Sequence, residues 1–414
     1  RPSVVAPVYE CVVWGGQERP PLHAMAISFK GKEPMRKVAI VGSAQTVHER
    51  RKADQNVEDM IYETVTAPLE KTGLAINDVE MVMGAGDDVM DGRSISNVFT
   101  AEYAGAFLKE ESKVEDDGAF AACYAFMRIA AGAFDTILVY GYSKASDSSP
   151  QHYSGMIADP FYLRPLGIDA LTAAALQAQC YFQKHGVSEE DAAMVAVKNR
   201  RHALSNPYAQ IKGEYTVDDV MRSPMIASPI KRLDASPSTD GCCALLLMSE
   251  DAVKRHDLKP AWIRGVGFCT DTYYLGHRDL TEIRSAHRAA ERAYKMAGIT
   301  DPYREIDVAE IHEPFAFQEL MLVEALGFCE KGKGREFSYS GDTDFYVAGL
   351  LPVNLSGGAL SANPIFAAGL IRLAEAANQV TGQTNGYPIE PRTAVAHATS
   401  GFALQSNIVY VLSA

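Results

Sequence analysis

The sequence lacks several features that would define its class at once. No two of its seven cysteines are spaced as CxxC, so we expect neither a zinc site nor a disulfide framework, and reduced cytoplasmic thiols are the simplest interpretation. No apolar run reaches the roughly 20 residues that a membrane-spanning helix needs. Basic residues are in deficit, because 39 Lys and Arg face 52 Asp and Glu, which gives a net charge of −13. That balance argues against nucleic acid or an anionic membrane as a general partner.

The residues that are present describe a large globular protein. The chain has 414 residues, of which 47% are hydrophobic and 22% charged, and this length suggests two or three domain-sized units. The first 34 residues contain five prolines but no apolar core of signal-peptide type, and a strand-like run follows Met35 directly. We therefore expect residues 1–34 to form an N-terminal extension, either an ordered arm or a dispensable tail.

Short apolar runs alternate with helix-like patterns along most of the chain. KVAIVG (37–42) and TILVYG (136–141) are typical of buried strands, whereas residues 57–72 have the apolar spacing of a helix. This alternation predicts an α/β protein with a parallel sheet. The regularity is lost from about 146 to 228, which predicts an inserted loop domain.

The last third of the chain repeats the scheme of the first. Strands are expected near 306–311, 393–396 and 407–412, with helices at 285–297, 314–326 and 364–381. The repetition indicates an internal duplication. We therefore predict an N-terminal half (35–145 and 229–258), a loop domain (146–228) and a C-terminal half (259–414).

Four segments together resemble the thiolase superfamily, in particular its branch of sterol-carrier-protein-x and archaeal thiolases. The segments are RLDASPSTDGCCA (232–244), EIHEPFAFQELMLVEALGF (310–328), NLSGGALSANPIFAAG (354–369) and the closing stretch 397–412. In this order they resemble the family's RxxDxxPxxDGAAA segment, its HDAF motif with the ELLxxEALGF helix, its NxSGGxxxxGHPxGATG segment and its HNxGG strand pair. The order and spacing agree over residues 35–414. The resemblance implies a thiolase fold of five αβαβα layers, with two duplicated halves, an inserted loop domain and assembly as a dimer.

The resemblance also implies that the usual nucleophile is missing. Family members acylate a thiolate in a CASGxxA motif at the start of a helix, where the helix N-terminus lowers the pKa of the thiol. Ile129 and Gly132 match the IxxG of that helix, and counting back places Glu115 at the cysteine position. Cys123 lies eight residues further on and is expected to be a buried, inert thiol. Glu115 either caps the helix or, turned inward by the fold, acts as a general base.

Three further residues match positions of the family's active site. The chain has Ala362-Asn363-Pro364 in place of GHP, so Asn363 replaces the oxyanion-hole histidine and can still donate a hydrogen bond. His312 matches the first residue of HDAF, and His397 matches the histidine of HNxGG. Both are candidate catalytic residues, with a hydrogen-bonded core histidine as the alternative. Pro314 replaces the proton-transferring cysteine of the HDCF variant.

Candidate contacts with coenzyme A come from two segments. Gly357 and Gly358 match a glycine pair that lets the backbone approach the pantetheine arm in the family. Tyr273, Tyr274 and His277 fall where family members place residues near the substrate, with a solvated loop as the alternative. The resemblance implies coenzyme A as a substrate, no tightly bound cofactor and no metal site.

Three functions are compatible with these residues. The first is thiolase chemistry in which a 3-oxoacyl-CoA and CoA give two acyl-CoAs, with the CoA thiol attacking directly. The second is retro-aldol cleavage of a 3-hydroxyacyl-CoA, although the aldolases of this fold have tyrosine where this chain has His312 and Asn363. The third is a non-catalytic subunit of a hetero-oligomer. The branch implies a homodimer core and a small zinc-ribbon and OB-fold partner subunit, and we expect the protein in the cytoplasm.

Overall fold

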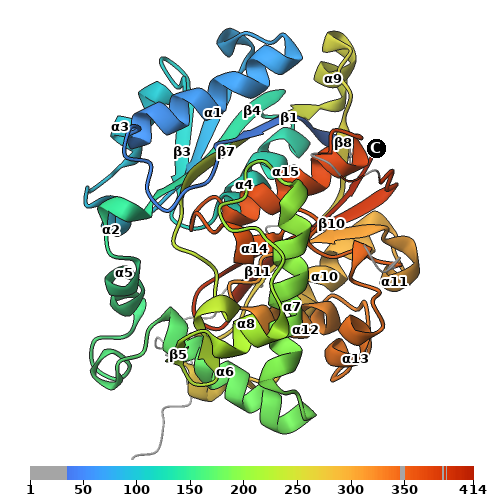
Figure 1. Ribbon diagram of the computed structural model, residues 1–414. Helices are drawn as coiled ribbons and strands as arrows, with labels where there is room; N and C mark the ends of the chain where they lie inside the picture. Colours follow the sequence, from blue (N-terminus) through green and yellow to red (C-terminus); the bar gives the residue numbers. More distant parts are fainter. Residues whose placement is uncertain (1–34, 346–349, 385–386, 388) are drawn as a thin grey trace, which may run out of the picture. The chain divides into compact units, whose positions relative to one another are not determined.

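The computed structural model describes residues 35–345, 350–384, 387 and 389–414. Residues Arg36–Ala414 form one compact unit (Figure 1). Among the helices in the described part of the chain, none combines the length and the apolar character that crossing a membrane requires.

A nine-stranded mixed sheet forms the centre of this unit. The strands follow the order β3-β2-β4-β7-β1-β8-β11-β10-β9. Their bounds are β1 (Val38–Gln45), β2 (Met81–Ala85), β3 (Glu110–Val114), β4 (Thr136–Lys144), β7 (Asp240–Ser249), β8 (Ala261–Thr270), β9 (Val308–Glu310), β10 (Thr393–Ser400) and β11 (Ser406–Ser413). Strands β3, β2 and β4 run parallel, as do β9 and β10, and every other neighbouring pair is antiparallel. The parallel sheet expected from the sequence is therefore present only at the two ends, because antiparallel β7, β1, β8 and β11 occupy its middle.

The two halves of the sheet repeat one connectivity. In the N-terminal half β2 pairs in parallel with β4, and β7 and β1 follow in antiparallel order; β9, β10, β11 and β8 repeat this pattern in the C-terminal half. In the C-terminal half, a parallel bridge between Ala309 and Val353 takes the position that the pairing of β2 with β3 has in the N-terminal half. The halves join where Ala39 of β1 lies opposite Trp262 of β8. The predicted duplication is thus present in the topology.

Helices form three layers around the two halves of the sheet. The bounds are α1 (Val57–Thr72), α4 (Gly118–Ala130), α10 (Arg284–Ala297) and α15 (Ala368–Val380). Helix α1 packs on β1, β4 and β7, whereas α10 packs on β8 and β11. Helices α4 and α15 contact each other and lie between the halves, sharing one hydrophobic cluster with strands of both (Figure 1). The layers follow the order αβαβα, as the motifs predict.

The remaining helices surround these layers. They are α2 (Asp88–Asp91), α3 (Asn97–Tyr103), α5 (Pro150–Ile157), α6 (Ala170–His185), α7 (Glu189–His202), α8 (Val217–Arg222), α9 (Glu250–His256), α11 (Pro302–Glu305), α12 (Ala316–Ala325), α13 (Gly334–Tyr339) and α14 (Gly358–Ser361). Residues 146–228, all of them described, add no strand to the nine-stranded sheet; β5 (Met225–Ala227) pairs with β6 (Ile230–Lys231) alone. Helix α7 of this stretch packs on α12 of the C-terminal half.

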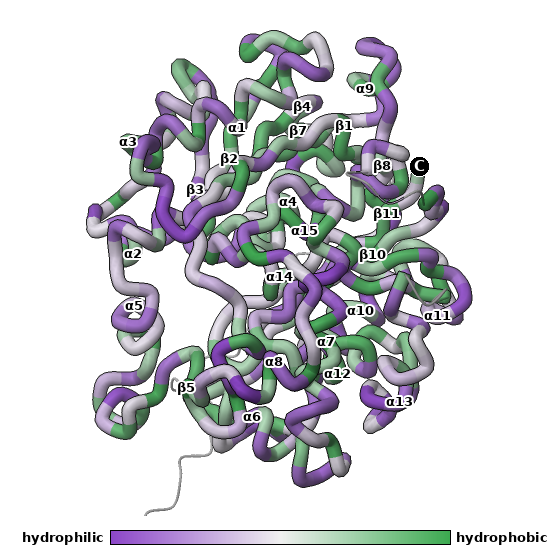
Figure 2. Tube along the Cα trace, viewed as in Figure 1, coloured by the Kyte–Doolittle hydropathy of each residue, from purple (hydrophilic) through white to green (hydrophobic). Residues whose placement is uncertain are grey.

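Local sequence explains where the principal elements begin and end. Asn56 and Asp59 form a reciprocal capping box at the start of α1, and Gly73 ends it with φ 69°. Ser188 and Asp191 start α7 in the same way. Strands β4 and β7 are buried along their whole length, and Figure 2 shows apolar residues concentrated along them.

Candidate active site

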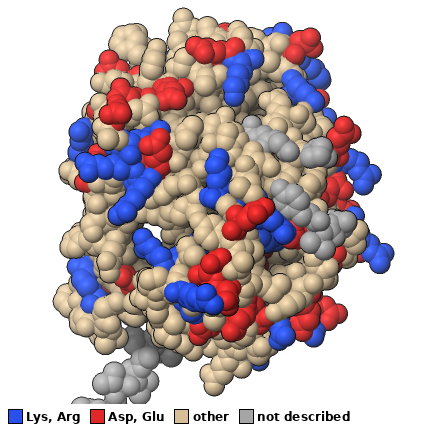
Figure 3. All heavy atoms as spheres, in the orientation of Figure 1, with Lys and Arg blue, Asp and Glu red and all other residues tan. Residues whose placement is uncertain are grey.

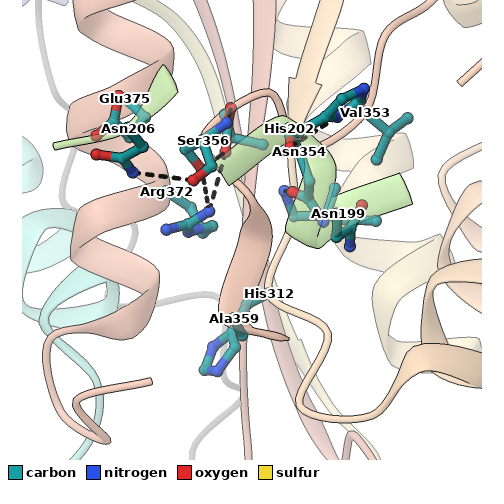
Figure 4. A network of polar contacts seen from close by, with 12 residues as sticks. Asn199, His202, Asn206, His312, Val353, Asn354, Ser356, Ala359, Arg372 and Glu375 are labelled. Atoms are coloured by element: carbon teal, nitrogen blue, oxygen red, sulfur yellow. Dashed lines mark hydrogen bonds and ion pairs between the residues drawn. The ribbon is translucent and has the colours of Figure 1, made fainter. Parts of the chain in front are cut away.

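His312 lies just beyond β9, with 5% of its surface exposed. Neither ring nitrogen forms a hydrogen bond with any residue that the structure describes. Burial is the main cause that lowers the pKa of His312 to about 3, and the charges of His397 and Arg372 add to it. The imidazole is therefore neutral at pH 7, with one N–H donor uncommitted. Figure 4 shows its ring pointing away from the polar network drawn above it.

Asn363 lies close enough to His312 for its side chain to raise the pKa of the imidazole. Its backbone amide donates to Thr239 Oγ1 at 3.0 Å, and its Nδ2 donates to Ser236 Oγ at 2.9 Å. Its buried Oδ1 has no hydrogen-bond partner in the described residues. His312 and Asn363 are thus neighbouring polar side chains, and N–H groups of such side chains can bind a carbonyl oxygen as it becomes negative.

His397 contacts the backbone of His312. It lies in β10 and is buried, and its Nδ1 accepts a long hydrogen bond of 3.4 Å from the backbone N–H of His312. Its Nε2 lies 2.9 Å from Asn407 Oδ1, and Asn407 Nδ2 donates to Ser285 Oγ at 2.7 Å. Burial lowers the pKa of His397 to about 4. Both of its ring nitrogens are occupied, so the structure resembles the hydrogen-bonded core histidine that the sequence left as the alternative.

The N-termini of α4 and α15 meet at the buried carboxylate of Asp117. Its Oδ1 accepts from Ala119 N and its Oδ2 from Gly369 N, each at 2.8 Å, so one side chain caps both helices. Burial raises the pKa of Asp117 to about 7 against the effect of these bonds. A Cβ on Gly369 would lie 2.4 Å from Asp117 Oδ1 and 2.2 Å from Ala398 Cβ. The central helices therefore meet β10 at close range.

Asp116 is a half-buried acid that the sequence motifs do not single out. Burial raises its pKa, while hydrogen bonds from Ser400 and the Asp117 amide lower it; the latter measures 2.8 Å. Ser400 is the last residue of β10. Three consecutive acids precede α4, and only the three-dimensional structure shows which of them turns toward β10.

Glu115 does not turn inward as expected. Its side chain is 52% exposed and forms an ion pair with Lys113 at 3.1 Å. Strand β3 ends at Val114 on the edge of the sheet, so the next side chain faces solvent. The expected burial of Glu115 is therefore corrected for the single chain. Cys123 is buried in α4, and burial raises the pKa of its thiol to about 11.

The glycine pair is required by packing within the protein. Gly357 and Gly358 have φ of 96° and 64° and are buried. A Cβ on Gly357 would lie 2.5 Å from Ala203 Cβ, and one on Gly358 would lie 2.0 Å from Glu313 Oε1. These contacts explain both glycines, and an additional approach to pantetheine stays a prediction.

The tyrosine segment joins the C-terminal half to residues 146–228. Tyr273 Oη donates to the carbonyl of Ile157 at 2.7 Å, and its ring meets that of Tyr274 edge-on at 5.1 Å. The rings of Tyr274 and His277 are 5.8 Å apart, and His277 is exposed. His312 and Asn363 are thus brought together, whereas Tyr273, Tyr274 and His277 form a separate group.

Comparison with known proteins identifies the family. The family model for the thiolase N-terminal domain matches residues 38–251, and the model described as thiolase C-terminal domain-like matches residues 267–414. The chain belongs to the thiolase family. An acetyl-CoA acetyltransferase of Methanothermobacter thermautotrophicus is 31% identical over 366 residues, which cover 86% of this chain and 94% of the relative. The family and fold predicted from the motifs are confirmed, and relatives with this name support an enzyme of the acyl-CoA acyltransferase class.

Other similar proteins carry different names. Benzoylsuccinyl-CoA thiolase subunit BbsB of Thauera aromatica is 36% identical over 231 residues, covering 55% of this chain and 59% of that subunit. The solved structure of an Ltp2-ChsH2(DUF35) aldolase matches with a TM-score of 0.75 at 24% identity, covering 91% of this chain and 98% of that chain. Human mitochondrial 3-ketoacyl-CoA thiolase in complex with CoA matches with a TM-score of 0.71 at 17% identity, covering 92% and 98%. These two structural matches show the fold.

Proposed function

We propose that this thiolase-family chain makes or cleaves C–C bonds of acyl-CoA thioesters without a cysteine nucleophile of its own. The observation that carries the proposal is the pair of neighbouring buried side chains, His312 with an unpartnered N–H and Asn363, in a chain whose helix α4 begins directly after three acids. The residues before α4 are Glu115, Asp116 and Asp117. A site with oxyanion donors and carboxylates fits attack by the thiol of CoA better than acylation of the enzyme.

In the cleavage direction a carboxylate takes the proton of the CoA thiol, and the thiolate attacks C3 of a 3-oxoacyl-CoA. His312 and Asn363 donate hydrogen bonds to the oxygen that becomes negative at C3. When the C2–C3 bond breaks, the electron pair goes to C2 and forms the enolate of the departing thioester. The carboxylic acid returns the proton to C2. Two acyl-CoAs result, and the enzyme ends in its starting protonation state.

Asp116 is the carboxylate that we assign to this proton transfer, in place of Glu115. It is half-buried beside Ser400 at the end of β10, and burial raises its pKa, which makes it a stronger base than a solvated carboxylate. Glu115 is held at the surface by Lys113. His397 serves the site by holding the backbone of His312.

Two alternatives have their own support. Retro-aldol cleavage of a 3-hydroxyacyl-CoA would use the same base and donors, and the structural likeness to the Ltp2-ChsH2(DUF35) aldolase favours it. A non-catalytic role in a hetero-oligomer is favoured by the relative named as a subunit of benzoylsuccinyl-CoA thiolase. The products formed from each substrate class separate all three functions.

Coenzyme A enters this proposal as a substrate, with no tightly bound cofactor. Its contacts are assigned to Gly357, Gly358, Tyr273, Tyr274 and His277, as in the resemblance. On the face drawn in Figure 3 the described Lys and Arg residues are interspersed with Asp and Glu, which fits a small-molecule substrate better than nucleic acid. The described cysteines are free thiols, which fits the cytoplasm.

A homodimer is proposed because β3 is an edge strand next to exposed apolar side chains. Val98, Phe107 and Leu108 are 73%, 77% and 90% exposed, and they precede the strand in sequence. Such an edge is a template for pairing with a second chain. A small partner subunit, of the zinc-ribbon and OB-fold type that the resemblance implies, is proposed in addition, because one relative is named as a subunit of benzoylsuccinyl-CoA thiolase.

The test is to incubate the purified protein, alone and with candidate partner subunits, with CoA and a panel of 3-oxoacyl- and 3-hydroxyacyl-CoAs. Mass spectrometry then identifies the products. Two thioesters from a 3-oxoacyl-CoA, lost on His312→Ala but kept on Cys123→Ser, is the expected result. A free aldehyde or ketone from a hydroxyacyl-CoA would establish the aldolase. CoA binding without turnover in any combination would favour the non-catalytic subunit.

A further inference from the structure

Glu313 connects the two segments that carry the proposed oxyanion donors. It follows His312 in sequence and is completely buried. Its Oε2 accepts from Ala359 N and its Oε1 from Leu360 N, each at 3.3 Å. These amides belong to α14, and Asn363 follows this helix by two residues. One carboxyl group therefore joins the segment of His312 to the segment of Asn363.

The backbone of α14 leaves this carboxyl group no room to move. A Cβ on Gly358 would lie 2.0 Å from Glu313 Oε1 and 2.7 Å from Asn354 Nδ2, and Gly358 has φ +64°. Both the absence of a side chain and the left-handed conformation are needed for this approach. Glycine at position 358 is thus explained by the position of Glu313.

Helix α7 holds the other side of Glu313. Asn199 Nδ2 donates to Glu313 Oε1 at 3.0 Å and to Glu319 Oε2 at 2.9 Å. Lys198 Nζ forms an ion pair with Glu319 Oε1 at 2.7 Å, and Asn354 Nδ2 donates to Glu319 Oε2 at 3.2 Å. Figure 4 shows Asn199 and Asn354 side by side in this network. Glu313 is therefore fixed between α14 and a helix of the 146–228 stretch.

Burial and the neighbouring charge of Glu319 give a carboxyl group at position 313 a high free-energy cost. Glu313 and Glu319 are both fully buried, and Lys198 is the ammonium group that pairs with Glu319. Burial and the charge of Glu319 raise the pKa of Glu313 to about 8, against the effects of Arg372 and the backbone amides. A well-packed apolar residue is often more stable than such a buried group. The contacts therefore point to a role other than stability.

We propose that Glu313, held by Asn199, is a positioning residue that fixes His312 relative to Asn363 and so shapes the pocket for the carbonyl oxygen of the acyl group. The inference rests on the proposed function of those two donors. It also gives the 146–228 stretch a part in the chemistry, because Asn199 of α7 holds the carboxyl group of Glu313 by a hydrogen bond.

Calorimetry with two probes tests this without turnover. The probes are CoA and S-acetonyl-CoA, a ketone that carries a carbonyl oxygen but no thioester to cleave. The parent is expected to bind acetonyl-CoA more tightly than CoA. Glu313→Gln places an amide N–H₂ against a backbone donor, and Asn199→Ala removes the contact from α7. Each is expected to reduce the preference for the ketone about 10-fold, the size of one hydrogen bond, and to leave the affinity for CoA unchanged.

Glu375→Gln is the matched control. Glu375 is also buried, accepts from Gln45 Nε2 at 2.6 Å and lies on α15, so the variant removes a buried carboxyl group elsewhere. The inference is overturned if Glu313→Gln and Asn199→Ala keep the ketone preference, or if Glu375→Gln loses it equally. Equal binding of both probes by the parent would instead contradict the proposed oxygen pocket, and the inference with it.

Discussion

At the scale of single residues, burial shifts the pKa of several ionisable groups of the interior toward their neutral forms. Burial lowers the pKa of His48 and His312 to about 3 and that of His397 to about 4. Burial also raises the pKa of Asp117 and Glu375 to about 7. Neutral donors and protonated acids suit a site that must stabilise charge only when the reaction creates it.

Glu375 provides a test of these shifts that does not need activity. Its pKa rises from the ordinary value of 4.5 to about 7 in the folded protein, mainly because of burial and then because of the charge of Glu310. A raised folded pKa contributes stability that is present below pH 4.5 and is lost as the pH rises through 7. Glu375→Gln removes this loss while keeping an acceptor for Gln45. We expect the variant to gain about 2 kcal/mol relative to the parent between about pH 5 and pH 8.

Chemical denaturation of both proteins at about pH 5 and pH 8, on either side of the raised pKa of Glu375, measures the difference. A difference that does not change with pH would show that Glu375 is ionised in the folded protein at both values.

The choice of Asp116 over Glu115 as the base gives a second residue-scale prediction. Asp116→Asn keeps the acceptor for the Asp117 amide but removes the base, so turnover is expected to fall about 100-fold or more. Glu115→Gln alters a surface ion pair and is expected to change turnover little. Steady-state rates on the substrate identified by the panel decide between them. The reverse result would restore Glu115 as the base.

At the scale of elements, the site depends on how closely α4 and α15 meet. Gly369→Ala would place a methyl group against Asp117 and Ala398, so we expect the free energy of unfolding to fall by about 1–3 kcal/mol. Gly155→Ala, in a helix with nothing within 4 Å of the new Cβ, is the control and should not destabilise the protein. Equal stability of both variants, measured by urea unfolding, would show that the two helices are not packed as described.

The sequence predicts elements well where local signals are strong. Residues 57–72 form a helix with those bounds because Asn56 and Gly73 cap its ends. Strand β3 is not predicted from the sequence, since Glu110, Glu111 and Lys113 give it no buried face, and an edge strand needs none. Without that strand, the sequence gives no reason for Glu115 to face solvent.

At the scale of the whole molecule, the motifs predict the family and the layers, whereas the candidate site is predicted only in part. His312 and Asn363 are proposed from the sequence because each stands in a motif. Glu313 and Asn199 are not, because their importance arises from a contact between residues 114 positions apart in the chain. Such long-range pairs leave no periodic signal in a single sequence.

The proposed dimer gives the prediction at this scale. Phe107→Lys together with Leu108→Lys places two charges beside the β3 edge, and we expect a monomer in sedimentation velocity. Leu166→Lys, at a position 75% exposed on the 146–228 stretch, is the control and should leave the assembly unchanged. A double variant that sediments like the parent would place the interface elsewhere.

The central claim, catalysis without an enzyme thiolate, is tested most directly by intact-mass spectrometry of the protein during turnover after its accessible thiols have been alkylated with iodoacetamide. The account predicts that turnover of a 3-oxoacyl-CoA continues and that the protein mass shows no acyl adduct, because the CoA thiol attacks the substrate itself. Loss of activity on alkylation, together with an acyl adduct on a cysteine of the untreated protein, would contradict it.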